Sequence, residues 1–285
     1  MVRVSAIQMA MSEDKKFNIS KAISLVKQSA KNCAQIILLP ELFETLYFCK
    51  DMDKKYLSLA SPLKNNSLIK QFSDLAKELK VVILVSYFEK SKEDYFNSLV
   101  VINADGFVMD NYRKTHIPDG HGYEEKFYFK DGDTGFKVYE TAFGKIGVGI
   151  CWDQWFCETA RALTLKGAEI IFYPTAIGSE PEIKLDSKEH WQRVQMGHAA
   201  TNTVPVVVAN RIGKEVAKSS ELTFYGSSFI TDYTGKIITE ASRDKEEIIY
   251  ADFDLEKNAK QRKYWGLLRD RRPSCYGDLV SPLLR

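Results

Sequence analysis

Three side chains that could act together chemically follow three strand-like apolar runs of the sequence. Glu41 comes directly after Ile36–Pro40, Lys114 closes the run that follows the first hairpin turn, and Cys151 comes directly after Lys145–Ile150. Ligands of open α/β sheets bind beyond the carboxyl ends of strands, so these three side chains could converge on one cleft. A thiol, a carboxyl group and an ammonium group placed together could attack a carbonyl carbon, move a proton and stabilise an oxyanion.

Cys151 is the best single candidate for a nucleophile. The sequence places it between a strand end and a helix whose first turn carries Asp153, a good N-capping residue. The partial positive charge of a helix N-terminus lowers the pKa of a nearby thiol and raises its thiolate fraction. Free cysteines are also among the most buried residues, so core packing stays open for Cys151 on position alone. A plain structural role is the preferred interpretation of the remaining cysteines, Cys33, Cys49, Cys157 and Cys275.

A cysteine nucleophile needs a base, and the sequence offers two kinds. The usual base is histidine, so a Cys–His hydrolase remains an alternative for a chain that contains His116, His121, His190 and His198. Glu41 is the other candidate, because burial at the end of an apolar strand suits a carboxyl group to proton shuttling. A solvated loop position would explain Glu41 equally well, and a single lysine such as Lys114 is more often a surface residue.

Composition excludes several classes of protein. The 285 residues carry 40 basic and 38 acidic side chains and are 45% hydrophobic, which is not the composition of a disordered chain. The basic residues are interleaved with acidic ones, so nucleic acid is not an expected partner. Five cysteines without a C-x-x-C pair argue against a zinc ribbon or a disulfide framework and favour a reducing cytosol. With no signal peptide and no apolar run of membrane-spanning length, we expect a cytoplasmic protein.

Alternation of β-branched runs with amphipathic stretches predicts an α/β fold with a mixed sheet in one domain, residues 1–285. Turn sequences at Asn103–Gly106 and Asp232–Gly235 predict two hairpins. The predicted helices are Asp14–Asn32, Leu68–Leu79, Asp153–Lys166 and about Asp186–Asn202. The predicted strands are Val2–Met9, Gln35–Leu39, Val81–Phe88, Ser98–Asn103, Lys145–Ile150, Glu169–Tyr173, Val204–Asn210, Ser227–Asp232 and Ile248–Phe253.

The same three residues carry a resemblance to a known family. Glu41 in LLPELFE, Lys114 in YRKTHIPDG and Cys151 in GICWDQWF resemble the three signatures of the nitrilase-type carbon–nitrogen hydrolases, in the same order and spacing. The resemblance runs from the first strand to about Tyr276. It implies a four-layer α-β-β-α sandwich with two mixed sheets, a Glu–Lys–Cys triad, a homo-oligomer, and no metal or organic cofactor.

Carried onto this chain, the resemblance makes Cys151 the nucleophile, Glu41 the general base and acid, and Lys114 the stabiliser of the oxyanion. The family's second glutamate matches Glu125 better than its neighbour Glu124. The backbone N–H of Trp152 is a further candidate for holding the oxyanion. The sequence departs from the family pattern at Cys157, where relatives tend to carry proline, and at His121.

Longer strings, among them FYPTAIGSEP, NRIGKE and WGLLRDRRP, resemble the family members that act on N-carbamoylputrescine. That substrate is a terminal urea joined by a tetramethylene chain to an ammonium group, and its hydrolysis gives putrescine for polyamine synthesis. We expect Glu180 to anchor the ammonium group, and Tyr47 and Trp152 to line the apolar chain. Other carbamoyl compounds (an N-carbamoyl amino acid or carbamoyl-β-alanine), an ω-amide, or a non-catalytic binding protein on the same fold are the alternatives. The cluster Arg269, Arg271 and Arg272 suggests ion pairing, including at a subunit contact.

Overall fold

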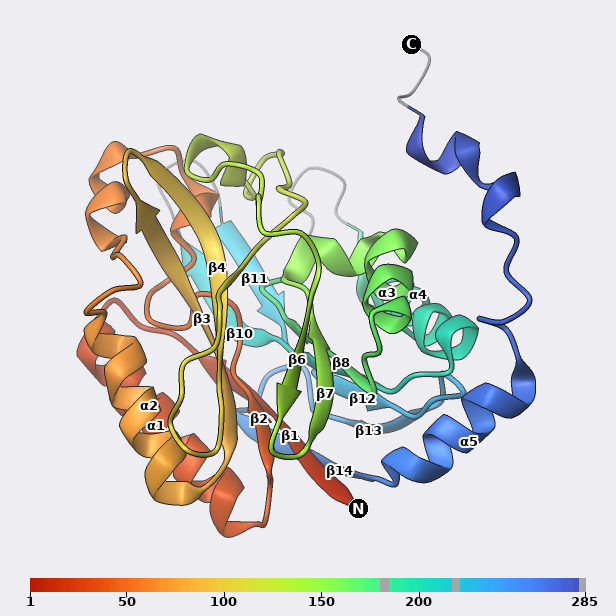
Figure 1. Ribbon diagram of the computed structural model, residues 1–285. Coiled ribbons are helices and arrows are strands. Elements are labelled where there is room, and N and C mark those ends of the chain that lie inside the picture. Colours follow the sequence, from red (N-terminus) through yellow and green to blue (C-terminus); the bar gives the residue numbers. More distant parts are fainter. Residues whose placement is uncertain (180–184, 217–220, 282–285) are drawn as a thin grey trace.

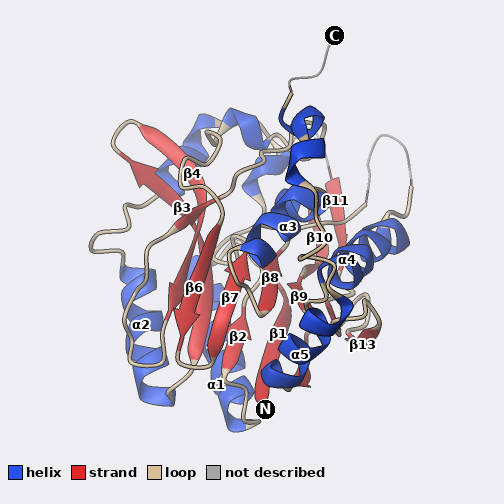
Figure 2. Ribbon diagram, turned by 45° about the vertical axis from the view of Figure 1, so that its right-hand side comes forward, coloured by secondary structure: helices blue, strands red, loops and turns tan. Residues whose placement is uncertain are grey.

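The chain folds into two stacked β-sheets with helices on both outer faces (Figure 1). The computed structural model describes residues 1–179, 185–216 and 221–281. Helices α1 (Lys15–Lys31) and α2 (Ser67–Leu79) cover one sheet. Helices α3 (Cys157–Leu165) and α4 (Lys188–Asn202) cover the other, so the layers run α-β-β-α (Figure 2). The predicted four-layer sandwich with two mixed sheets is therefore confirmed.

The first sheet has the strand order β11-β10-β1-β2-β3-β4-β5, with β14 also paired to β1. Strands β10, β1, β2 and β3 pair in parallel, and the remaining pairs are antiparallel. The strand bounds are β1 Val2–Ala10, β2 Ile36–Leu38, β3 Val82–Ser91, β4 Asp94–Ile102, β5 Tyr112–Arg113, β10 Arg211–Val216, β11 Glu221–Tyr225 and β14 Glu247–Phe253.

The second sheet has the order β13-β12-β9-β8-β7-β6. Its centre, β7, β8 and β9, is parallel, and antiparallel strands flank it on both sides. The strand bounds are β6 Lys137–Thr141, β7 Gly144–Val148, β8 Ile170–Pro174, β9 Val206–Ala209, β12 Phe229–Thr231 and β13 Ile237–Glu240.

Strand periodicity explains how one short strand serves two cores. In β2 and the residue after it, Ile36 and Leu38 pack between the two sheets, whereas Ile37 and Leu39 pack against α1 and α2. Successive side chains of a strand point to opposite faces, so a strand covered on both faces is apolar throughout. The first polar side chain beyond this run is Glu41, which places it at the carboxyl end of a rigid strand.

Helices α1 and α2 each begin at a residue whose side chain caps the helix N-terminus. Asp14 accepts hydrogen bonds from the backbone N–H of Lys16 and Phe17 at the start of α1, and Asn66 caps α2 in the same way. A last α-helix, α5 (Leu255–Trp265), ends at Gly266, whose φ of +69° suits glycine. The chain then runs as an arm along the outside of the α3–α4 layer (Figure 1). Of the helices described, none has the length and apolar character needed to cross a membrane.

The predicted elements are confirmed except for one helix start and several strands. The helix predicted over Asp153–Lys166 begins only at Cys157, because Cys151–Trp155 forms a separate 3₁₀ turn, η4, that ends at Phe156. Asp153 therefore does not cap α3. Both predicted hairpin turns are present. Strands β6, β10 and β11 and helix α5 were not predicted, and β5 and β13, which follow the two predicted turns, were expected without stated bounds.

Candidate active site

Glu41, Lys114 and Glu125 meet in the interior of the protein. Glu41 lies in the loop after β2, Lys114 follows β5, and Glu125 begins the short 3₁₀ turn η3 (Glu125–Phe127). Nζ of Lys114 lies 2.9 Å from Oε1 of Glu41, 2.8 Å from Oε1 of Glu125 and 2.7 Å from its Oε2. None of the three side chains has exposed surface. The structure thus brings together the two acidic residues and the lysine singled out from the sequence.

Cys151 stands beside this cluster in an unusual backbone conformation. Its φ is +41°, and a positive φ at a residue other than glycine is uncommon and concentrates at functional sites. Its Sγ donates a long hydrogen bond of 3.7 Å to the carbonyl of Ala176, and only 6% of the residue is exposed. The charges of Glu41, Lys114 and Glu125 all act on the pKa of this thiol. The sharp turn after β7 therefore places the sulfur of Cys151 beside the cluster of Glu41, Lys114 and Glu125.

The resting form of Cys151 is the thiol, which corrects the expectation of a thiolate. Burial raises its pKa well above the usual value, and Glu41 and Glu125 raise it further, against a lowering by Lys114. The predicted lowering by a helix N-terminus is absent, since η4 is a five-residue 3₁₀ turn, too short for a strong dipole. A buried thiol of this kind needs a base at the moment of attack.

Lys114 is held as an ammonium group. Burial by itself would lower its pKa, but the charges of Glu125 and Glu41, with a further contribution from Cys151, outweigh it and keep the pKa well above the usual value. Burial and the nearby Glu41 raise the pKa of Glu125, while Lys114 lowers it. Lys114 therefore suits the role of a fixed positive charge rather than that of a base.

Two further side chains complete the cluster, and sequence reasoning assigned neither contact. Nδ2 of Asn97, on β4, donates to Oε1 of Glu41 at 2.7 Å and approaches Oε2 of Glu125 at 3.4 Å. The hydroxyl of Tyr47 donates to Oε1 of Glu125 at 2.7 Å. Oε2 of Glu41 is buried without a hydrogen-bond partner among the described residues, so it is the oxygen available to accept a proton. An amide within an apolar strand is the signal that could have revealed Asn97.

The predicted substrate-binding residues lie in different environments. Tyr47 is fully buried, and its ring packs against Tyr123 and Phe224. Trp152 is 38% exposed. The first backbone hydrogen bond of η4 runs from the N–H of Asp153 to the carbonyl of Ile150, and the N–H of Trp152 lies one residue before that donor. Glu180 lies outside the described residues. The cluster of Arg269, Arg271 and Arg272 lies near the start of the arm that follows α5, where Arg269 pairs with Asp270.

The histidines occupy other positions. His116 contacts Asp153 and stacks on Phe156, with ring centroids 3.7 Å apart. His190 packs edge-on against Trp155, His121 is exposed, and Nε2 of His198 lies 3.0 Å from the carbonyl of Gln154. The side chains with the largest effects on the pKa of Cys151 are Glu41, Lys114 and Glu125, and none of these three is a histidine. The geometry therefore favours Glu41 over a histidine as the base.

Asp153 ties the turn that bears Cys151 to the segment that bears Lys114. One carboxylate oxygen accepts from the N–H of Ile150 at 2.9 Å and from the hydroxyl of Tyr112 at 2.8 Å. The other accepts from the N–H of His116 at 2.9 Å and lies 2.7 Å from its Nδ1. Asp153 is fully buried, so these contacts fix the two segments relative to each other.

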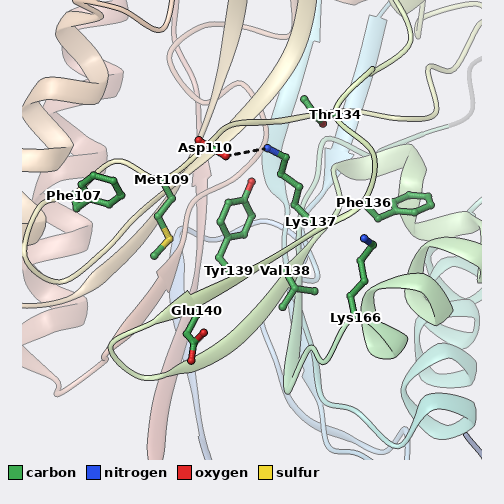
Figure 3. Close-up of a pocket in the computed structure, with 10 residues that line it drawn as sticks. All are labelled: Phe107, Met109, Asp110, Thr134, Phe136, Lys137, Val138, Tyr139, Glu140 and Lys166. Carbon is green, nitrogen blue, oxygen red and sulfur yellow. Dashed lines mark ion pairs between the residues drawn. The ribbon is translucent and has the colours of Figure 1, made fainter.

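A surface groove of about 810 Å³ runs beside the edge strand β6, where Lys137 pairs with Asp110 at 3.7 Å (Figure 3). Its walls include Phe107 and Lys166, and no predicted site residue lines it. In the part of the chain that the structure describes, no group of histidine, cysteine and acidic side chains could hold a metal ion.

Comparison with known proteins finds relatives that match nearly the whole chain. Residues 3–263 match the family model described as carbon-nitrogen hydrolase. N-carbamoylputrescine amidase of Arabidopsis thaliana is 52% identical, over 98% of this chain and 95% of that protein. Citrullinase of Francisella tularensis is 50% identical, over 98% of both chains. The crystal structure of a carbon-nitrogen hydrolase from Helicobacter pylori G27 is 38% identical, with a TM-score of 0.92 and 99% of both chains covered.

A more distant solved structure extends the likeness to the wider superfamily. Saccharomyces cerevisiae Nit3, a member of the nitrilase superfamily, is 28% identical with a TM-score of 0.80, over 95% of this chain and 96% of that one. The family model covers most of the chain, including Glu41, Lys114, Glu125 and Cys151. The chain belongs to the carbon–nitrogen hydrolase family.

Proposed function

We propose that this chain hydrolyses N-carbamoylputrescine to putrescine, carbon dioxide and ammonia, within a single domain spanning residues 1–285. The observation that carries the chemistry is the buried ammonium group of Lys114, held between Glu41 and Glu125 beside the thiol of Cys151. The substrate is supported by relatives named N-carbamoylputrescine amidase in Arabidopsis thaliana and Solanum tuberosum, 52% and 50% identical over nearly the whole chain. Putrescine formation would place the reaction in polyamine synthesis from agmatine.

The first half-reaction releases ammonia. A urea carbonyl is a weak electrophile because both nitrogens donate into it, so attack needs a strong nucleophile and stabilisation of the developing oxyanion. Glu41 takes the proton of Cys151 as the sulfur bonds to the carbonyl carbon. Lys114 and the N–H of Trp152 hold the oxyanion. The C–N bond to the terminal nitrogen then breaks, Glu41 returns the proton to that nitrogen, and a thiocarbamoyl-enzyme remains.

The second half-reaction releases the amine. Glu41 takes a proton from water, the oxygen bonds to the thiocarbamoyl carbon, and the C–S bond breaks. The proton returns to the sulfur, which regenerates the thiol. The released carbamate decomposes to carbon dioxide and putrescine. One carboxylate, that of Glu41, serves both half-reactions. Glu125 holds Lys114 in position throughout, and Asn97 holds Glu41.

Citrulline is the second candidate substrate. Citrullinase of Francisella tularensis is 50% identical over 98% of this chain, nearly as similar as the plant enzymes. Citrulline presents the same terminal urea but carries a carboxylate as well as an ammonium group at its far end. A single carboxylate such as Glu180 suits the ammonium group of carbamoylputrescine, whereas citrulline also needs a cation. Trp152 and Tyr47 are proposed to line the path of the methylene chain.

Ammonia release from a panel of carbamoyl compounds tests the proposal. We expect the highest kcat/KM with N-carbamoylputrescine, and the panel includes citrulline, carbamoyl-β-alanine and an ω-amide. Preference for citrulline would transfer the activity to the second candidate, and no ammonia from any compound would favour a non-catalytic protein. Glu180→Gln should raise KM for carbamoylputrescine alone. Cys151→Ala should abolish turnover, whereas Cys157→Ala, at an exposed thiol, should not.

We also propose a cytoplasmic homo-oligomer. The arm after α5 exposes several large apolar side chains to solvent in the single chain, and exposed apolar patches of this kind mark interaction surfaces. These side chains are Leu267, Leu279 and Val280, and Trp265 at the end of α5 is exposed as well. Light scattering coupled to size-exclusion chromatography should give a mass above 32.5 kDa, and replacing Leu279 and Val280 by serine should lower it.

A further inference from the structure

A buried ion pair on β10 lies directly beneath the loop that carries Glu41. Nη1 of Arg211 lies 2.9 Å from Oε1 of Glu215, and the two side chains are 0% and 3% exposed. Removing two charges from water is costly unless further hydrogen bonds satisfy them, so a pair this deeply buried calls for an explanation. The other contacts of the pair explain its burial, because nearly all of them are made with the loop between Glu41 and Tyr47.

Arg211 binds the first part of that loop. Its Nη2 donates to the carbonyl oxygens of Glu41 at 2.8 Å and of Leu42 at 3.0 Å, and its Nη1 donates to that of Thr45 at 3.4 Å. Leu42 has a φ of +48°, a strained value for a residue other than glycine. The guanidinium group thus fixes the backbone at Glu41 and at the bend that follows it.

Glu215 binds the end of the same loop. Its Oε2 accepts from the N–H of Tyr47 at 2.6 Å and from Nζ of Lys50 at 3.2 Å. The hydroxyl of Tyr47 in turn donates to Glu125. One ion pair is therefore connected to both carboxylates that hold Lys114, to Glu41 through its own backbone and to Glu125 through Tyr47.

The loop between Glu41 and Tyr47 has few backbone hydrogen bonds of its own. Outside the ion pair, its backbone is bound by Ser86, which accepts from the N–H of Leu42, and by Asn18, which donates to the carbonyl of Glu44. Residues 41–47 form neither helix nor strand, and their own backbone hydrogen bond, from Thr45 to Leu42, is long at 3.4 Å. The rings of Tyr47 and Phe224 cover the guanidinium group at 5.7 and 5.2 Å. A strained, irregular loop keeps one conformation only if its surroundings over-determine it.

We propose that Arg211 and Glu215 are positioning residues that set the orientation of the Glu41 carboxylate toward Cys151. Neither residue touches the substrate, and both act through the loop. The inference rests on the proposed function only in taking Glu41 as the base of Cys151. It holds for either substrate, because the urea end is the same.

Alkylation of Cys151 by iodoacetamide tests the inference without any substrate. In that reaction Glu41 takes the thiol proton, the S–C bond forms and iodide leaves. Arg211→Lys keeps the charge but loses the planar fork, and it should slow alkylation of Cys151 roughly tenfold to a hundredfold. Modification is followed at the peptide containing Cys151, since Cys33, Cys157 and Cys275 are also exposed to the reagent.

Arg262→Lys is the matched control. Arg262 is another largely buried arginine that grips two backbone carbonyls, those of Thr203 and Ala168, but on α5. Both variants lose a guanidinium fork and should lose thermal stability, yet Arg262→Lys should leave the alkylation rate within about twofold of the wild type. If Arg211→Lys fails to fold, Glu215→Asp, which shortens the same contacts, takes its place.

A double-mutant cycle shows whether Arg211 acts through Glu41. Glu41→Gln should slow alkylation by itself, and adding Arg211→Lys to it should cause no further loss. The same factor in both backgrounds, or an unchanged rate in Arg211→Lys alone, would overturn the inference and leave the proposed function standing. An unchanged rate in Glu41→Gln would instead refute the proposed base. In steady-state turnover of N-carbamoylputrescine, Arg211→Lys should lower kcat and leave KM nearly constant.

Discussion

At the scale of single residues, the balance of charge in the interior determines what each group can do. Two carboxylates, Glu41 and Glu125, surround one ammonium group, and all three side chains are fully buried. Burial stabilises the neutral thiol of Cys151, and the carboxylates strengthen that preference. In the proposed mechanism, the thiolate therefore forms only when Glu41 removes the proton, and the position of one carboxylate oxygen controls the onset of reaction.

Lys114→Met tests whether the ammonium group holds the cluster together. Methionine keeps much of the volume but leaves two buried carboxylates facing each other, and breaking a buried pair in this way costs about 3–5 kcal/mol. We expect a loss of that size in the free energy of unfolding by urea, together with loss of turnover. Adding Glu125→Gln should recover part of the stability, because one of the two opposed charges is removed.

The control for this variant lies on the surface. Lys70 and Asp74 form an exposed pair on α2 at 2.8 Å, and such pairs contribute about 0.3–0.5 kcal/mol. Lys70→Met should therefore change stability only slightly. If Lys114→Met proved equally mild, the buried cluster would not depend on its ammonium group.

At the scale of secondary-structure elements, strand ends placed the reactive residues and irregular segments oriented them. The apolar run before Glu41 and the one before Cys151 are visible in the sequence, so the convergence of their strand ends could be predicted. The break between η4 and α3 could not, because it depends on Asp153 contacting Ile150, Tyr112 and His116 across the fold.

Strands β10 and β11 were not predicted, because they too depend on contacts between residues far apart in the sequence. The segment Arg211–Val216 contains arginine, lysine and glutamate, which sequence patterns assign to solvent. Arg211 and Glu215 are nevertheless buried, because they pair with each other and form hydrogen bonds with the loop that begins at Glu41. Tertiary partners of this kind cannot be inferred from periodicity, and the same holds for Asn97 on β4.

Asp153→Asn tests the connection between the segment that bears Cys151 and the segment that bears Lys114. The amide keeps the shape but can present only one oxygen, whereas the carboxylate accepts from two backbone N–H groups and two side chains. At least one N–H then faces an NH₂ group, and a buried unsatisfied donor costs about 1–3 kcal/mol. We expect a lower unfolding free energy and slower alkylation of Cys151.

Asp254→Asn is the comparison for that variant. Asp254 accepts from the N–H of Lys257 at the exposed start of α5, where asparagine is an equally good cap. Its stability should stay close to that of the wild type. A loss of stability in Asp153→Asn without slower alkylation would show that Asp153 supports the fold but does not place Cys151.

At the scale of the whole molecule, the four-layer stack buries polar groups on a large scale as well as apolar ones. Tyr47, Tyr112 and Tyr173 are all fully buried between or beside the sheets. Burial raises the pKa of each phenol above its usual value, and nearby acidic groups contribute: Glu125 for Tyr47, and Asp153 for the other two. A fold with such groups loses stability in alkali, because the unfolded chain releases protons that the folded chain retains.

Tyr173→Phe isolates one of these groups, since its hydroxyl has no hydrogen-bond partner among the described residues. The folded pKa of Tyr173 lies above the unfolded value of about 10, so its contribution to stability is complete below pH 10 and is lost progressively above it. At about pH 11 the wild type should have lost about 1.4 kcal/mol more than Tyr173→Phe, relative to neutral pH. Urea unfolding at both pH values measures this difference. Tyr264→Phe, at a residue 82% exposed, should show no such difference from the wild type. If the unfolding free energy of the wild type and of Tyr173→Phe fell equally with pH, the phenol of Tyr173 would ionise within the folded protein.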